Sequence, residues 1–241
     1  MLKYRTIKTA NEEADMEPIV LDEIDFQLSY TKIAHKMRVR EDSKQEKQLR
    51  DLLDEALSIA RPRALYTIAT IDEKEENGVV LDGIRMESRV MRVNLEEIHR
   101  VFPFVITCGT ELYDWKNTQE DMLLKFYADE INQAAMRKAG NVLLDHLKET
   151  YQLGKTAAMN PGSLEDWPVT AQRSLFELLG DPEKLIGVKL LDSMLMIPNQ
   201  TVSGIRFVTD GDFSSCSMCP IENCPHRSAP YDQELYDQKY S

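Results

Sequence analysis

The spacing of apolar residues along the chain predicts three main helices. Residues 41–60 carry apolar side chains at intervals of three and four with charged residues between them, which is the pattern of an amphipathic helix. The longest such stripe covers residues 120–151 and predicts a central helix. A third helix is expected over 169–179, before the stop signal Gly180-Asp-Pro182, and a short one around 95–100.

Short runs of β-forming residues predict a sheet. Residues 64–71 are rich in such residues, and Asn77-Gly78 is a turn signal before the apolar residues of 79–84, so a hairpin is expected. Two further apolar runs, 102–107 and 202–208, predict buried strands. Helices and strands alternate irregularly and include a hairpin, which favours an α+β fold with a mostly antiparallel sheet over a doubly wound parallel one.

The same pattern divides the chain into three parts. Residues 1–18 are polar and aperiodic and are interpreted as a mobile or partner-dependent N-terminal arm. Residues 19–208 form the α+β domain. Residues 209–241 form an irregular tail with little apolar content, and this tail holds three of the four cysteines.

Charge and composition exclude several classes of function. The 241 residues are 42% hydrophobic and 29% charged, as in ordinary globular proteins. A net charge of -12 without a basic cluster argues against a nucleic-acid partner. No apolar run is long enough for a signal peptide or a membrane span, so no membrane partner and a cytoplasmic location are expected.

The cysteine spacing in the tail predicts a metal site. Cys216, Cys219 and Cys224 lie within nine residues, and two- and four-residue gaps allow three thiolates to reach one centre. Either Cys108 or His226 completes the set. With Cys108 the site is all-thiolate and suits an iron–sulfur cluster or zinc, and with His226 it favours structural zinc. The alternative is a tail with three free or disulfide-prone cysteines.

A second candidate site is the loop Asn160-Pro161-Gly162-Ser163…Trp167-Pro168. Gly162 allows the backbone to approach a ligand closely, Pro161 stiffens the turn, and Trp167 offers a flat face for stacking. The alternative interpretation is an ordinary connection that is anchored by a buried Trp.

This loop and the segments around it resemble a known family. Over residues 19–208 the chain is similar to the activation (reactivation) domain of vitamin B12-dependent methionine synthase, in its short stand-alone bacterial form. The likeness is carried by these segments: the region 65–90, Phe104-Val-Ile-Thr-Cys-Gly109, Asn160-Pro-Gly162…Asp166-Trp-Pro168, and Ile186-Gly-Val188…Leu191-Asp-Ser-Met-Leu-Met-Ile-Pro198…Val202-Ser-Gly204.

The resemblance implies a curved antiparallel sheet with a long central helix, S-adenosylmethionine binding, and a corrinoid (cobalamin) protein as partner. In that family an electron from a donor protein, together with the methyl group of S-adenosylmethionine, restores methylcobalamin from cob(II)alamin. The chain is therefore expected to be a corrinoid-protein reactivation factor in a cobalamin-dependent methyltransferase system. The cysteine spacing, which is not part of the family's domain, adds the expectation of an iron–sulfur cluster in the tail. The alternative is a non-catalytic module that docks on a corrinoid protein and holds structural zinc.

The resemblance also implies the ligand residues. The family's loop reads Arg-x-Ser/Ala-Pro-Gly-Tyr, and this chain has Ala158 in place of the Arg and Ser163 in place of the Tyr. Loss of a guanidinium–carboxylate contact weakens binding by about 1.5–3 kcal/mol, unless Lys155 replaces it. The expected ligand residues at this loop are Lys155, Asn160, Pro161, Gly162, Ser163 and Trp167. The expected metal ligands, which come from the cysteine spacing and not from the resemblance, are Cys216, Cys219, Cys224 and Cys108.

Overall fold

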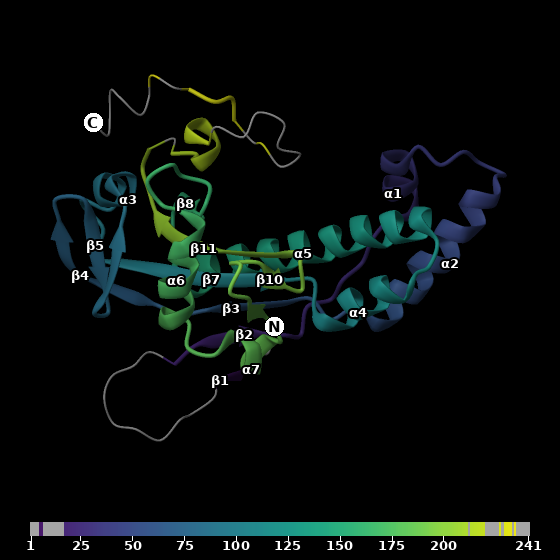
Figure 1. Cartoon of the computed structure of the whole chain (residues 1–241), viewed down its shortest axis with the longest axis horizontal. Coiled ribbons are helices and arrows are strands. Elements are labelled where there is room, and N and C mark those ends of the chain that lie inside the picture. The colour runs from purple at the N-terminus through teal and green to yellow at the C-terminus, as the bar shows by residue number, and fades with distance from the viewer. Residues whose placement is uncertain are drawn as a thin grey trace.

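A nine-stranded sheet with a long helix across one face organises the chain (Figure 1). This computed structural model describes residues 5–6, 17–211, 213–219, 227, 229–232 and 234. The strands of the sheet are β1 (Arg5–Thr6), β2 (Ile19–Leu21), β3 (Arg63–Tyr66), β4 (Ala69–Glu75), β5 (Gly78–Leu81), β6 (Ile84–Glu87), β7 (Arg100–Thr107), β8 (Thr156–Met159) and β11 (Thr201–Val208). Strands β9 (Lys189–Leu190) and β10 (Met196–Ile197) form a separate pair.

The helices divide between the two faces and the ends of the sheet. They are α1 (Tyr30–Met37), α2 (Lys44–Ile59), α3 (Arg89–Asn94), α4 (Thr110–Thr118), α5 (Met122–Tyr151), α6 (Gln172–Leu178) and α7 (Pro182–Ile186), with 3-10 turns η1 (Val169–Ala171) and η2 (Ser215–Met218). Helix α5 lies along the sheet, α1, α2 and α4 gather beyond one end of it, and β4, β5 and α3 lie at the other end (Figure 1).

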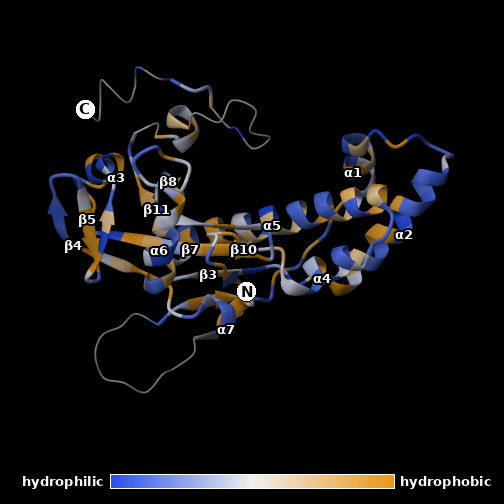
Figure 2. Cartoon of the chain, viewed as in Figure 1, coloured by the Kyte–Doolittle hydropathy of each residue, from blue (hydrophilic) through white to orange (hydrophobic). Residues whose placement is uncertain are grey.

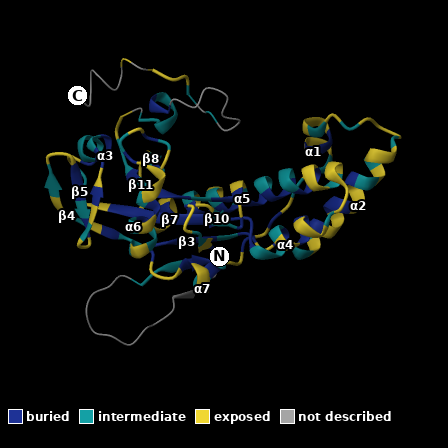
Figure 3. Ribbon diagram, in the orientation of Figure 1, coloured by how far each residue is buried: buried dark blue, intermediate teal, exposed yellow. Residues whose placement is uncertain are grey.

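Strand β7 is the centre of the sheet. It pairs with β3 and β4 on one edge and with β11 on the other, and each of these ladders is antiparallel. All of β7 after its first residue is buried, which the burial colouring also shows (Figure 3). The α+β fold and its mostly antiparallel sheet are thereby confirmed.

Two hydrophobic clusters fill the two faces of the sheet. Side chains alternate along a strand, so Phe102, Phe104 and Ile106 of β7 pack into the cluster under α5, while Val101 and Val105 join the opposite cluster with α3 and α6. Helix α2 extends the first cluster through its apolar side, with hydrophilic residues on its other side (Figure 2).

Helices α2, α5 and α6 and the β4–β5 hairpin lie where the sequence predicts helices and a hairpin. Two local predictions are wrong. Residues 64–71 are not one strand, because β3 ends at Tyr66 and β4 begins at Ala69. The expected helix at 95–100 is wrong, since the helix in this region is α3, six residues earlier. It begins there because the Ser88 hydroxyl accepts a hydrogen bond from the Met91 amide at 3.0 Å and caps the first turn.

Part of the expected N-terminal arm pairs with the sheet. Arg5 and Thr6 of the expected N-terminal arm pair with Val20 and Ile19. The rest of residues 1–16 lies outside the described residues. The described helices include none with the length and apolar character to cross a membrane.

Candidate functional site: a groove between the loop 160–168 and the cysteine tail

The loop 160–168 begins where β8 leaves the edge of β11. Strand β8 pairs with β11 only over Ile205–Val208, so Thr201–Gly204 is an edge that β8 does not cover. Asn160 caps this edge by donating its side-chain amide to the Ser203 carbonyl at 2.7 Å. Gly162 then takes a left-handed conformation, with φ of 81°, and donates its amide to the Trp167 carbonyl at 2.8 Å. The loop is therefore closed on itself and has a fixed shape.

Trp167 anchors the loop instead of facing a ligand. Its side chain is completely buried in the cluster on the α6 face. A ring without exposed surface is not available for stacking on a bound molecule. The structure therefore places Trp167 as the support of the loop, not as part of a ligand surface.

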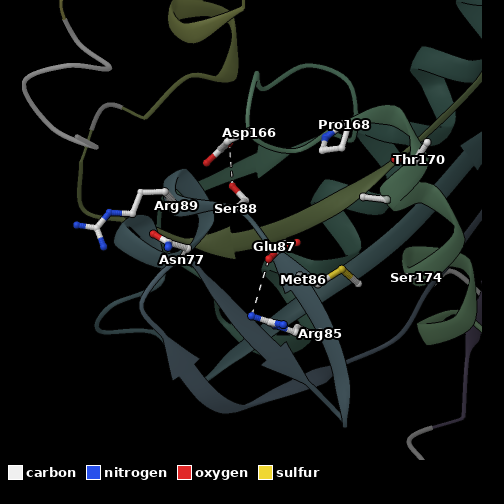
Figure 4. A pocket seen from close by; sticks show the side chains of 11 residues that line it. Asn77, Arg85, Met86, Glu87, Ser88, Arg89, Asp166, Pro168, Thr170 and Ser174 are labelled. Carbon is white, nitrogen blue, oxygen red and sulfur yellow. Dashed lines mark hydrogen bonds and ion pairs between the residues drawn. The ribbon is translucent and has the colours of Figure 1, made fainter.

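Asp166 ties the other side of the loop to α3. One of its carboxylate oxygens accepts a hydrogen bond from the Ser88 hydroxyl at 3.0 Å (Figure 4). The other accepts a hydrogen bond from the Val90 amide at 2.9 Å. A cavity of about 610 Å³ lies on this side of the loop, between β6, α3 and η1. Its cationic side chains are already engaged, because Arg85 pairs with Glu75 at 2.6 Å and Arg89 donates to the Glu76 carbonyl at 2.8 Å.

A larger cavity of about 880 Å³ opens on the opposite side of the loop. We call it the loop–tail groove, because the loop forms one wall and the cysteine tail another. Its remaining walls come from the middle of α5 and from the chain around the start of β11. It is lined by Gln133, Met136, Arg137, Asn160, Pro161, Ser163, Gln172, Met196, Asn199, Gln200, Thr201, Val202, Ser203, Ser215, Cys216, Cys219 and Arg227.

Three contacts dock the start of the tail on the domain. The Ser215 hydroxyl donates to the Ala158 carbonyl of β8 at 2.7 Å. Met218 is only 5% exposed and joins the cluster on the α6 face. The Phe213 ring packs on Phe207 of β11 with ring centroids 5.7 Å apart. The tail therefore lies over β8 and β11, beside the loop.

The two described tail cysteines border this groove. The Cys219 amide donates to the Cys216 carbonyl at 3.4 Å, which makes a tight turn between them. Arg227 holds the turn from outside, since its guanidinium donates to the carbonyls of Cys216 at 2.7 Å and Cys219 at 2.8 Å. Cys224 and His226, the further expected ligands, lie outside the described residues.

Cys108 lies elsewhere. It is completely buried in the cluster under α5 and does not line the loop–tail groove. Burial raises the pKa of its thiol to about 12, because the low-dielectric core disfavours the thiolate. Within the part of the chain that the structure describes, no three His, Cys, Asp or Glu side chains are grouped to hold a metal ion. Cys108 is thus not brought together with Cys216 and Cys219.

Lys155 also differs from its expected place. It precedes β8 and is exposed, and it is not among the residues that line the groove. The cross-strand partner of Ala158 is Arg206. That side chain donates to Thr156 at 3.1 Å, and desolvation lowers the pKa of Arg206.

The groove contains polar side chains that sequence reasoning did not identify. Gln172, Gln200 and Ser203 are each at least nine-tenths buried, and one oxygen of each has no hydrogen-bond partner among the described residues. Glutamines carry no motif, and the only local signal is the four-residue spacing of Gln133 and Arg137 on one helix face.

Neither a scan against protein-family models nor a search of curated proteins gives a match. Among solved structures, the chain is similar to the crystal structure of the MetH reactivation domain bound to AdoHcy, with a TM-score of 0.59 and 16% sequence identity. The alignment covers 83% of this chain and 81% of that chain. The resemblance expected from the sequence is therefore confirmed at the level of the fold.

Proposed function

We propose that this chain is a corrinoid-protein reactivation factor that holds S-adenosylmethionine in the loop–tail groove. One observation carries the proposal. The loop residues Asn160, Pro161 and Ser163 and the tail residues Cys216 and Cys219, which the sequence marked as two separate sites, line the same groove. A fold shared with a domain that was crystallised with AdoHcy supports the same ligand class.

The role of the groove in this proposal is to hold the methyl donor in position. A donor protein supplies one electron to the corrinoid of the partner, and the methyl group then passes from the sulfonium to cobalt. The sulfur–carbon bond breaks as the cobalt–carbon bond forms, and S-adenosylhomocysteine remains. The protein contributes proximity and orientation, because the sulfonium and the corrinoid carry the chemistry. The closed loop around Gly162 provides the rigid wall that such positioning needs.

Cys216, Cys219 and Cys224 would hold an iron–sulfur cluster or zinc beside the groove. Two of these residues are joined by a tight turn at its border, which suits a shared metal centre. Cys108 is buried in the hydrophobic cluster under α5 and does not line the groove, so it is not placed to be the fourth ligand. A fourth ligand from His226 would favour zinc over an iron–sulfur cluster. A bound iron–sulfur cluster would supply a one-electron carrier at this place, whereas zinc would only stabilise the tail for docking.

Two measurements on anaerobically purified protein test the proposal. Titration calorimetry with S-adenosylmethionine is expected to give saturable binding, and the absence of heat up to millimolar ligand would refute the methyl-donor role. Iron, sulfide and zinc analysis is expected to find an iron–sulfur cluster that the Cys219→Ser variant loses. A colourless protein with stoichiometric zinc would instead support the docking module.

A further inference from the structure

The loop–tail groove differs in charge from the rest of the molecule. The chain has 41 acidic and 29 basic residues, yet among the described residues the groove is lined by two arginines and no carboxylate. One of the two, Arg227, already donates to the carbonyls of the tail turn. The groove therefore offers one guanidinium, that of Arg137, whose donors are not used by the tail.

Arg137 is held in place without being neutralised. It projects from the middle of α5 and donates to the side-chain oxygen of Gln133, one turn earlier, at 3.2 Å. In the described part of the chain it makes no ion pair, in contrast to Arg85 and Arg173, which each contact a carboxylate. A guanidinium has five donors in a planar fork, so most of those of Arg137 remain for a carboxylate ligand.

Among the described residues, two buried oxygen atoms of the groove, those of Gln200 and Ser203, are free to accept hydrogen bonds. Gln200 has a defined orientation, because its amide nitrogen donates to both carboxylate oxygens of Asp129 at 3.0 Å. Its oxygen is therefore the atom that lacks a partner, and it is buried. The Ser203 hydroxyl is buried nearby on β11 and also has no partner among the described residues.

The acceptor position of Gln200 is fixed from behind. Lys116 contacts Asp129 at 2.6 Å and also donates to the side-chain oxygen of Asn199 at 3.2 Å. This network immobilises the two residues before β11 that line the groove. A buried acceptor without a partner costs roughly 1–3 kcal/mol, and a ligand that donates an N–H or O–H group to it recovers that cost.

We propose that Arg137 binds the carboxylate of an α-amino-acid-bearing ligand, and that Gln200 and Ser203 accept hydrogen bonds from its donor groups. The inference deepens the proposed function and rests on it, because S-adenosylmethionine is such a ligand. It gives the carboxylate contact to α5 instead of to Lys155 or to position 158 of the loop. Arg137 is then a specificity residue that distinguishes a ligand with an amino-acid end from one without it.

The test compares two thioethers that share the adenosine part. S-adenosylhomocysteine carries the amino-acid end, and 5′-methylthioadenosine lacks it. In calorimetry the wild-type protein is expected to prefer S-adenosylhomocysteine. Arg137→Gln should lower the affinity for S-adenosylhomocysteine by about 10- to 100-fold and leave the affinity for methylthioadenosine unchanged. The affinity of Arg137→Lys for S-adenosylhomocysteine should lie between those of the wild type and Arg137→Gln, because lysine keeps the charge and loses the bidentate fork.

Arg173→Gln is the matched control, since Arg173 lies on α6 outside the groove and pairs with Asp192 at 3.4 Å. It should keep the wild-type preference. If S-adenosylhomocysteine binds and Arg137→Gln binds it equally well, this inference is overturned and the proposed function stands. If wild-type protein binds neither thioether, both are overturned. If Arg137→Gln lowers the affinity for both thioethers by the same factor, the inference is also overturned, because such a result indicates a general effect on the groove.

Discussion

Met218 is the buried apolar anchor among the contacts that dock the cysteine tail, and its truncation gives the sharpest prediction. Met218 is 5% exposed and packs in the cluster on the α6 face, while the flanking residues hold the tail by one ring contact and one hydrogen bond. Met218→Ala removes the apolar part of this anchor and leaves Phe213 and Ser215 unchanged. We expect the tail to leave the groove more often, with the domain still folded.

The magnitude follows from the buried surface. Complete burial of a Met side chain contributes about 1.5–3 kcal/mol, and Ala keeps only its β-carbon, so the docked state should lose roughly 2 kcal/mol. Since about 1.4 kcal/mol corresponds to a factor of ten, the undocked fraction should rise by about 30-fold.

Thiol alkylation of metal-free protein followed by mass spectrometry measures this fraction, because a bound metal would itself protect Cys219. Cys219 is 8% exposed in the docked tail and should react in proportion to the undocked population when docking is fast. Cys108 is completely buried in the other cluster and reports global unfolding in the same sample. Met122→Ala is the matched control, because Met122 is 88% exposed and should change neither rate.

Two results would refute this reasoning. An unchanged Cys219 rate in Met218→Ala would mean that burial of Met218 does not hold the tail. An equal acceleration of Cys108 would mean that the substitution unfolds the domain as a whole, so that the tail and the domain are not separable units.

Three further predictions concern the loop, the core and the metal ligands. Gly162→Ala places a β-carbon on a left-handed backbone with φ of 81°, so it should lower the free energy of unfolding in urea by about 1–2 kcal/mol. Gly154→Ala, whose β-carbon meets open space, should leave that free energy unchanged. Equal effects of the two substitutions would contradict this reasoning. Burial lowers the pKa of His146. Below about pH 6.5 the unfolded chain therefore binds a proton at this histidine that the folded chain does not bind. As the pH is lowered, the free energy of unfolding should decrease more steeply in the wild type than in His146→Gln. Parallel pH profiles of the two proteins would argue against this reasoning. Cys108→Ala should retain the metal content that Cys219→Ser loses, and an equal loss would return Cys108 to the ligand set.

The sequence by itself determined the elements whose signals are local. The stripe of α5 and the Asn77-Gly78 turn depend on residues within one helix or one hairpin, and both appear where they were predicted. The missed helix α3 shows the limit of local signals. Its first turn is held not only by Ser88 but also by the carboxylate of Asp166, which lies 76 residues later than the Val90 amide that it accepts.

The site was predictable as two separate parts but not as one. The sequence marked the loop at Pro161-Gly162 and the tail at Cys216 and Cys219, because glycine, proline and cysteine spacings are themselves local patterns. Their meeting in one groove depends on the pairing of β8 with β11 and on the burial of Met218, both of which are contacts between distant segments.

The tertiary structure alone decided which polar residues face that groove. Cys108 follows strand β7 and is buried in the cluster under α5, whereas Met218 of the tail packs in the cluster on the opposite face. The sheet therefore separates the Cys108 thiol from the thiols of the tail. No sequence motif marks Arg137 or Gln200 as site residues. They share a site only because helix α5 and the start of β11 form one groove with the loop and the tail. Residue types are specified by the sequence, but the shared environment that gives them a common function arises from packing between segments far apart in the chain.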